Sequence, residues 1–368
     1  MRTVLHIGMP KTGTTALQEC LHASRRTLAD RGVLYPTNPP GCRFHNHRLL
    51  IFGYTPYRRL PRHVLRYPAY TEANLAEKYA EFLGHLHGQV RDARPGWVVL
   101  SSETLFRKLG REARRSLPRA LEPLGELAVA AYLRRPSEYY LSNLQQRLKH
   151  SYRIDWLWVP PMFEIVRSYA AVFGAKAVRP RIYDRTLIDQ GDIVRDFFRN
   201  SLPGAPVDLG ALTPGKHSNE TVSAEAVDLL SRYRAAFHPA ADNVSKRDSV
   251  ELVRTLRRLD AAVGARRPEL RPEIAERLDY ARSDPLRLRD AYGLAFPGLD
   301  YRRLERASRP WRRLRLPWRP RRLAELIFID PAVQRELLHR LTGSRWAGAE
   351  PARRAWVDGL LREPTGPA

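Results

Sequence analysis

The chain has 368 residues and a formal net charge of +24, from 63 Lys and Arg against 39 Asp and Glu. This length is enough to bury the core of one large α/β domain or of two domains. The charge favours polyanionic partners such as nucleic acid, acidic polysaccharide or anionic lipid without choosing among them, and the two cysteines, Cys20 and Cys42, give no disulfide framework.

The first apolar run, residues 3–7, is too short for a signal peptide, and no uncharged stretch approaches the ~20 residues needed to span a bilayer. We therefore expect a soluble cytoplasmic protein. Residues 3–7 are rich in β-branched side chains and predict a strand. Apolar residues then recur with helical spacing, at Leu17, Cys20, Leu21 and Leu28.

Residues 8–15, Gly-Met-Pro-Lys-Thr-Gly-Thr-Thr, join this strand to this helix. Gly13 allows close backbone approach, the first helical turn offers unpaired N–H groups, and Lys11 adds an ammonium, so the segment suits a phosphate. The alternative is a turn that caps the helix and binds nothing. A Walker A loop is not matched, because Lys11 precedes Gly13 by two residues instead of following it.

The order Pro-Lys-Thr-Gly-Thr-Thr resembles the 5′-phosphosulfate loop of sulfotransferases, which use 3′-phosphoadenosine 5′-phosphosulfate (PAPS). The resemblance implies a P-loop-like three-layer α/β fold with a central parallel sheet flanked by helices. It also implies PAPS as co-substrate without a metal. The residues that would bind the cofactor through this loop are Lys11, Thr12, Gly13, Thr14 and Thr15.

A Pro/Gly/His/Asn-rich loop, residues 37–47, follows a short predicted strand at 33–36. We predict that this loop lies on the acceptor side. His45 and His47 are two residues apart and suit substrate binding or a role as base, the alternative being solvated loop histidines. No Cys or carboxylate nearby completes a metal site.

Residues 96–101 form a compact apolar run that predicts a buried parallel strand, and Glu103 follows it. Ligands collect at the carboxyl ends of parallel strands, so a carboxylate there is placed for chemistry. The strand resembles the one that carries the catalytic base in sulfotransferases, where cytosolic members have a histidine. Glu103 is thus a candidate base, or else it caps or forms a salt bridge to the helix that begins near Thr104.

Residues 127–133 are the best candidate for a central strand, and Arg134-Arg135-Pro136-Ser137 follows, with Ser137 predicted to cap a helix. Ser142 lies eight residues after Arg134. A guanidinium at the strand end and a hydroxyl in the helix suit one phosphate. This spacing resembles the 3′-phosphate motif of the same family, which assigns Arg134 and Ser142 to the cofactor.

Helices are predicted at residues 72–86, 112–121 and 163–173, and Pro180 predicts that a strand at 177–183 lies at the sheet edge. The resemblance to bacterial sulfotransferases covers residues 1–233, where Lys216 in a late basic loop is a candidate nucleotide contact. Residues 234–368 are predicted to be a mostly helical basic region packed on this core. Within it, residues 298–323 carry many arginines with Trp311 and Trp318, which suits either an anionic membrane surface or a solvated connection.

These observations predict a sulfotransferase that moves a sulfuryl group from PAPS to a hydroxyl or amine, on a carbohydrate or glycolipid. Lys11 and Glu103 are the predicted catalytic residues, and nucleic acid is not an expected partner. The alternatives are a P-loop kinase or NTPase, and a non-enzymatic basic protein that binds nucleic acid.

Overall fold

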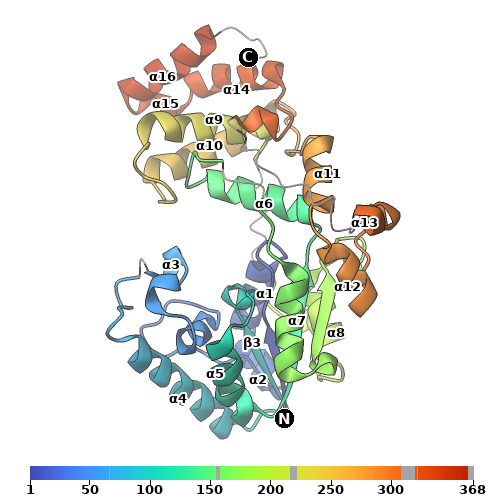
Figure 1. The fold of residues 1–368 in the computed structure, drawn as a ribbon. Helices are drawn as coiled ribbons and strands as arrows, with labels where there is room; N and C mark the ends of the chain where they lie inside the picture. Colours follow the sequence, from blue (N-terminus) through green and yellow to red (C-terminus); the bar gives the residue numbers. More distant parts are fainter. Residues whose placement is uncertain (66, 155–157, 216–221, 308–319, 321, 364–368) are drawn as a thin grey trace. The chain divides into compact units, whose positions relative to one another are not determined.

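A computed structural model describes residues 1–65, 67–154, 158–215, 222–307, 320 and 322–363 (Figure 1). The chain divides into two compact units. The first comprises Met1–Arg134, Pro160–Ser218 and Ser283–Leu299. The second comprises Arg135–Val159, Asn219–Arg282 and Asp300–Ala368. This division differs from the single boundary predicted after residue 233, because the chain passes from one unit to the other several times.

The first unit contains a five-stranded parallel sheet with the strand order β2-β3-β1-β4-β5. Its strands are β1 (Arg2–His6), β2 (Val33–Leu34), β3 (Trp97–Ser101), β4 (Glu126–Leu133) and β5 (Val178–Ile182). The apolar runs at 3–7, 96–101 and 127–133 therefore form the three central strands, as predicted. β5 lies at the edge, as Pro180 indicated, since proline cannot donate to a further strand.

Helices cover both faces of the sheet, so the prediction of a three-layer α/β fold is confirmed. On one face, Leu17 and Leu21 of α1 (Thr14–Ala23) and Phe197 of α8 (Ile193–Ser201) pack on Val4 and Tyr132 in one buried cluster. Alternate strand residues point to the other face. There α7 (Met162–Phe173) contacts β4 and β5.

Further helices and 3₁₀ turns complete the first unit. They are the helices α2 (Arg25–Ala29), α3 (Arg62–Leu65), α4 (Leu75–Ala93), α5 (Arg111–Leu121) and α12 (Asp284–Tyr292), and the 3₁₀ turns η1 (Arg48–Gly53), η2 (Tyr57–Arg59), η3 (Glu103–Leu105), η4 (Glu122–Leu124), η5 (Ala175–Ala177), η6 (Asp189–Gly191) and η7 (Leu209–Ala211). α12 is far from its neighbour α7 in sequence. The Asp284 carboxylate accepts a hydrogen bond from the Phe163 N–H at 3.0 Å, and Arg287 pairs with Glu164 at 2.7 Å.

The described residues of the second unit are mainly helical. The helices are α6 (Pro136–Leu148), α9 (Ala224–Phe237), α10 (Arg247–Ala262), α11 (Pro272–Tyr280), α13 (Tyr301–Ala307), α14 (Pro331–Thr342), α15 (Arg345–Gly348) and α16 (Pro351–Arg362), with the turn η9 (Leu323–Glu325). α6 begins at Pro136, so the prediction that Ser137 caps it is wrong. Proline is favoured at the first helical position, and the Ser137 N–H donates to the buried Asp279 at 2.9 Å instead.

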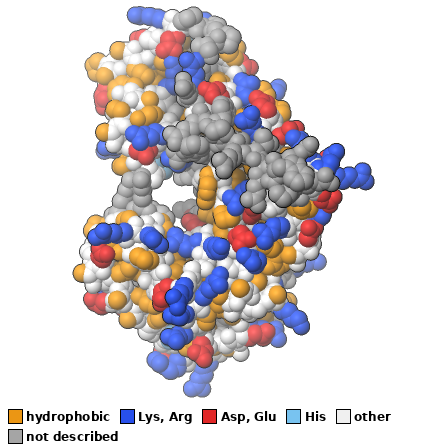
Figure 2. Space-filling view, viewed as in Figure 1, with side chains coloured by type: hydrophobic (Ala, Val, Ile, Leu, Met, Phe, Trp, Pro, Cys, Tyr) orange, Lys and Arg blue, Asp and Glu red, His pale blue; other side chains and the backbone are white. Residues whose placement is uncertain are grey.

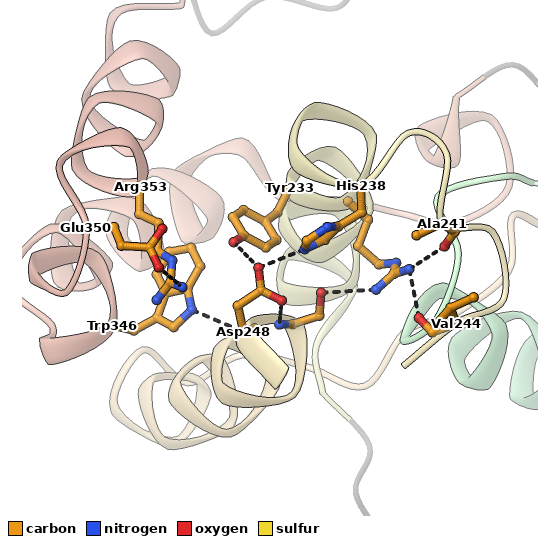
Figure 3. Close-up of polar contacts among 10 residues, drawn as sticks. Tyr233, His238, Ala241, Val244, Asp248, Trp346, Glu350 and Arg353 are labelled. Atoms are coloured by element: carbon orange, nitrogen blue, oxygen red, sulfur yellow. Dashed lines mark hydrogen bonds and ion pairs between the residues drawn. The ribbon is translucent and has the colours of Figure 1, made fainter. Parts of the chain in front are cut away.

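A polar cluster lies inside the second unit (Figure 3). The Asp248 carboxylate accepts hydrogen bonds from the Tyr233 hydroxyl and from His238 Nε2, each at 2.7 Å. Arg234 is fully buried and donates to Ser249 Oγ and to backbone carbonyls at Ala241 and Val244. Internal partners bind the Asp248 carboxylate and the Nη1 and Nη2 of Arg234, while Arg234 Nε is buried without a hydrogen-bond partner among the described residues. We assign the cluster a structural role in joining α9 to α10.

Basic side chains are distributed over the surface of both units with acidic side chains between them, as Figure 2 shows for one face. None of the helices in the described ranges is long and apolar enough to cross a membrane. Trp311 and Trp318, on which the predicted membrane-facing segment depends, lie outside the described residues, and so does Lys216.

Candidate functional site

The carboxyl ends of the three central strands bring together segments that are far apart in sequence. In the sheet, β1 lies between β3 and β4, and His6 is in register with Ser101 on one side and Ala130 on the other. The loop after β1, Glu103 after β3 and Arg134 after β4 therefore reach the same edge, which is where ligands bind in parallel sheets.

The loop at residues 8–15 has an unusual backbone. Gly8, Lys11 and Gly13 all have positive φ, at 43°, 70° and 76°. A Cβ on Gly8 would lie 2.6 Å from the Thr14 methyl group, so only glycine fits there. Lys11 adopts the same left-handed region with a side chain, which costs roughly 1–3 kcal/mol and is typical of functional sites.

The loop leads into the N-terminus of α1, which no side chain caps. The first N–H groups of the helix have no intrahelical acceptor, and the helix dipole favours an anion at this end. Thr15 is exposed and Gly13 is half-buried beside these N–H groups. The alternative prediction of a turn that caps this helix is therefore wrong as far as a side-chain cap is concerned, and ligand binding by the loop stays a prediction.

Two of the predicted threonines have internal partners. Thr12 is fully buried, and its hydroxyl donates to the Met9 carbonyl at 2.6 Å, so its side chain holds the loop and cannot reach a ligand. This corrects the prediction of a cofactor contact by that side chain. Thr14 is also buried, and its hydroxyl donates to Glu103 Oε2 at 2.8 Å.

Arg134 contacts the loop directly. Its Nη1 donates to the Lys11 carbonyl at 3.1 Å, its backbone N–H points to the sulfur of Met9 at 3.5 Å, and its guanidinium lies 5.9 Å from the centre of the Tyr183 ring. The two motifs singled out in the sequence, residues 8–15 and Arg134, are thus in contact. Ser142 is half-buried in α6 of the second unit, and its pairing with Arg134 stays a prediction.

Glu103 is half-buried at the start of η3. It does not cap that turn, because the Ser102 side chain accepts the hydrogen bond from the Thr104 N–H. The hydrogen bond from Thr14 directs the Glu103 carboxylate toward the end of the loop. Among the described residues no donor contacts the other carboxylate oxygen, which leaves it available to a substrate hydroxyl.

A buried hydrogen-bond chain supports the same edge. Gln18 donates to Ser101 Oγ at 3.1 Å and accepts from Asn46 at 3.2 Å. Ser101 Oγ also lies 2.8 Å from His6 Nδ1, and burial lowers the pKa of His6 to about 3, so its ring is neutral. The sequence interpretation missed Gln18. Its signal was a polar residue four positions after Thr14, on the buried face of the helix.

The two loop histidines have different roles. His47 is fully buried; its Nδ1 accepts from the Ser101 N–H at 3.0 Å and its Nε2 lies 3.0 Å from the Pro36 carbonyl. Burial lowers the pKa of His47 to about 4. Both ring nitrogens are occupied, which corrects the prediction that His47 binds substrate or acts as base. His45 is exposed and stacks on His22, with ring centres 3.8 Å apart.

Among the described residues, no three His, Cys, Asp or Glu side chains are grouped so that they could hold a metal ion. Comparisons of the chain with known protein families, curated proteins and solved structures found no match. The geometry at the carboxyl edge of the sheet is therefore the basis on which a function can be proposed.

Proposed function

We propose that this protein is a PAPS-dependent sulfotransferase that transfers a sulfuryl group to an acceptor hydroxyl or amine. The observation that carries the proposal is the contact between Arg134 and the Lys11 carbonyl, with Glu103 bonded to Thr14 on the other side of the loop. Two motifs that resemble the cofactor motifs of one enzyme family thereby meet at one sheet edge. A parallel sheet with an anion loop after its middle strand supports the P-loop-like type.

In this proposal the N–H groups of residues 12–15 and the ammonium of Lys11 bind the 5′-phosphosulfate. The acceptor oxygen attacks the sulfur, and the bond between sulfur and the bridging phosphate oxygen breaks. Lys11 stabilises the charge that develops on that oxygen, as a preorganised cation does in related transfers. Glu103 accepts the proton of the acceptor hydroxyl. Arg134, with Ser142 as its predicted partner, binds the 3′-phosphate.

A carbohydrate or glycolipid acceptor in the cytoplasm fits the basic surface and the sequence features best. The site requires no metal in this scheme, because backbone amides and side-chain cations neutralise the leaving phosphate. The two rival functions predict other ligands: ATP with Mg²⁺ for a P-loop kinase or NTPase, and oligonucleotides for a nucleic-acid-binding protein.

Calorimetric titration of the full chain with 3′-phosphoadenosine 5′-phosphate (PAP), with ATP–Mg²⁺ and with a DNA duplex tests the proposal. We expect PAP to bind and to be displaced by PAPS but not by ATP. Binding of ATP without PAP would favour the kinase, and binding of DNA alone would favour the non-enzymatic protein. A screen with labelled sulfate in PAPS then identifies acceptors.

A further inference from the structure

Arg48 is close enough to Glu103 to feel its negative charge and has no place in the chemistry proposed above. It begins η1, directly after the loop at residues 37–47, and is half-buried. Its guanidinium carbon is 3.8 Å from the centre of the Phe44 ring, and its Nε donates to Asn46 Oδ1 at 2.9 Å. Stacking and this hydrogen bond hold the guanidinium plane in one orientation.

The position of Arg48 is tied to the sheet edge. Asn46 is buried and donates to Gln18 Oε1 at 3.2 Å, and Gln18 donates to Ser101, two residues before Glu103. The hydrogen-bonded series of side chains that runs from Arg48 to Ser101 thus has little freedom to move. Such support is typical of a residue whose orientation matters to a ligand.

The charge of Arg48 is only partly compensated. Burial lowers its pKa, and the negative charge of Glu103 opposes that shift. However, no carboxylate among the described residues lies within ion-pair distance of its guanidinium, and Nη1 and Nη2 have no hydrogen-bond partner there. A half-buried guanidinium whose Nη1 and Nη2 have no partner among the described residues fits the two oxygens of a carboxylate or sulfate ester.

We propose that Arg48 binds an anionic group of the acceptor, so that the enzyme selects acidic carbohydrate over neutral carbohydrate. This inference rests on the proposed function, because it takes the Glu103 side of the loop as the acceptor side. The chemistry is that of a bidentate pair between a guanidinium and a carboxylate or sulfate ester on a sugar ring. The net charge of +24 would favour the approach of such a polyanion.

The test uses two probes that differ only in their carboxylates: a hyaluronan tetrasaccharide and its carboxyl-reduced form. Each is titrated calorimetrically into the PAP-saturated protein. The variants are Arg48→Gln, Arg48→Lys and Arg43→Gln, the last removing an exposed charge from the same loop. We expect the wild-type protein and Arg43→Gln to bind the acidic probe about tenfold or more tightly than the reduced probe. Arg48→Gln should lose that preference, and Arg48→Lys should retain part of it.

The alternative is that Arg48 acts only through the charge of Glu103. In that case Arg48→Gln would shift the pH dependence of transfer equally for acidic and neutral acceptors and leave probe preference unchanged. That result, or a PAP-loaded wild-type protein that binds neither probe or both equally, overturns the inference. Failure of PAP itself to bind would instead overturn the proposed function. Thermal unfolding of each variant checks that it is folded.

Discussion

The Thr14 hydroxyl donates a hydrogen bond to the Glu103 carboxylate at 2.8 Å, which joins the first turn of α1 to the end of β3. The contact places the candidate base at the edge of the anion loop. A general base is useful there only if it lies within hydrogen-bond reach of the substrate hydroxyl whose proton it removes.

We expect Glu103→Gln to lower turnover by about two orders of magnitude or more, because the amide keeps the shape of the side chain but cannot accept a proton. PAP affinity should barely change. Glu112→Gln, which removes an exposed carboxylate from α5, is the matched control. Turnover of PAPS with a labelled acceptor measures the effect. An active Glu103→Gln enzyme alongside an inactive His45→Ala enzyme would transfer the role to His45.

Substitutions of Lys11 can separate the effect of its charge on turnover from the effect of its backbone strain on stability. Lys11→Ala and Lys11→Gly both remove the ammonium, so both should lose roughly 10²–10³ in turnover. Because residue 11 has a φ of 70°, the glycine variant should be more stable than the alanine variant by about 1 kcal/mol. Urea unfolding measures the difference. Equal stability would show that the loop relaxes when the side chain is lost, and near-normal turnover would remove Lys11 from the mechanism.

We expect substitutions of Arg134 and Ser142 to affect ligand affinity differently, which the spacing of the two residues in the sequence did not indicate. Ser142→Ala should weaken PAP binding while leaving the affinity for an analogue without the 3′-phosphate unchanged. Arg134→Ala should weaken both ligands, and PAP more strongly, because the guanidinium also supports the Lys11 carbonyl. Calorimetry with the two nucleotides checks this. Equal losses of both ligands in Ser142→Ala would exclude it from the 3′-phosphate site.

Two buried histidines should make the protein sensitive to acid. The pKa of His6 is lowered to about 3 and that of His47 to about 4, so both rings stay neutral in the folded protein while the unfolded chain takes up protons below about pH 6.5. Folded-state stability should therefore fall as pH falls from about 6.5 toward 4, by roughly 1.4 kcal/mol per pH unit for each histidine.

The matched variant is His47→Gln, whose amide can accept from the Ser101 N–H and donate to the Pro36 carbonyl. Urea unfolding at pH 7 and pH 5 should show a smaller acid loss for this variant than for the wild-type protein. An identical loss in both proteins would mean that His47 is protonated in the folded state.

The elements that could be predicted from the sequence are those whose structure depends on the pattern of neighbouring residues. Residues 127–133 form an unbroken apolar run, and a run of this length is typical of a buried parallel strand. The positions of residues 8–15, Glu103 and Arg134 then follow from the rule that parallel strands share one carboxyl edge. Local sequence patterns therefore predicted which segments meet at the candidate site.

The predictions that were wrong or missing depend on tertiary contacts. His47 belongs to a loop that is polar in sequence, yet it is buried and hydrogen-bonded to Ser101 and Pro36. No local sequence pattern predicts those partners. Thr12 matches a ligand-binding motif, but its hydroxyl is used by the loop itself. Arg48 carries no motif, and its position depends on Phe44 and Asn46 together.

The packing of α12 against α7 has a consequence for how the protein is made. Asp284 and Arg287 hold Phe163 and Glu164 at the start of α7, although they are more than a hundred residues later in the chain. During synthesis the sheet can form early, but its covering helix gains these partners only after residue 287 has left the ribosome. A chain truncated at residue 233, a natural choice from the sequence, would leave the Phe163 N–H and the Glu164 carboxylate without them.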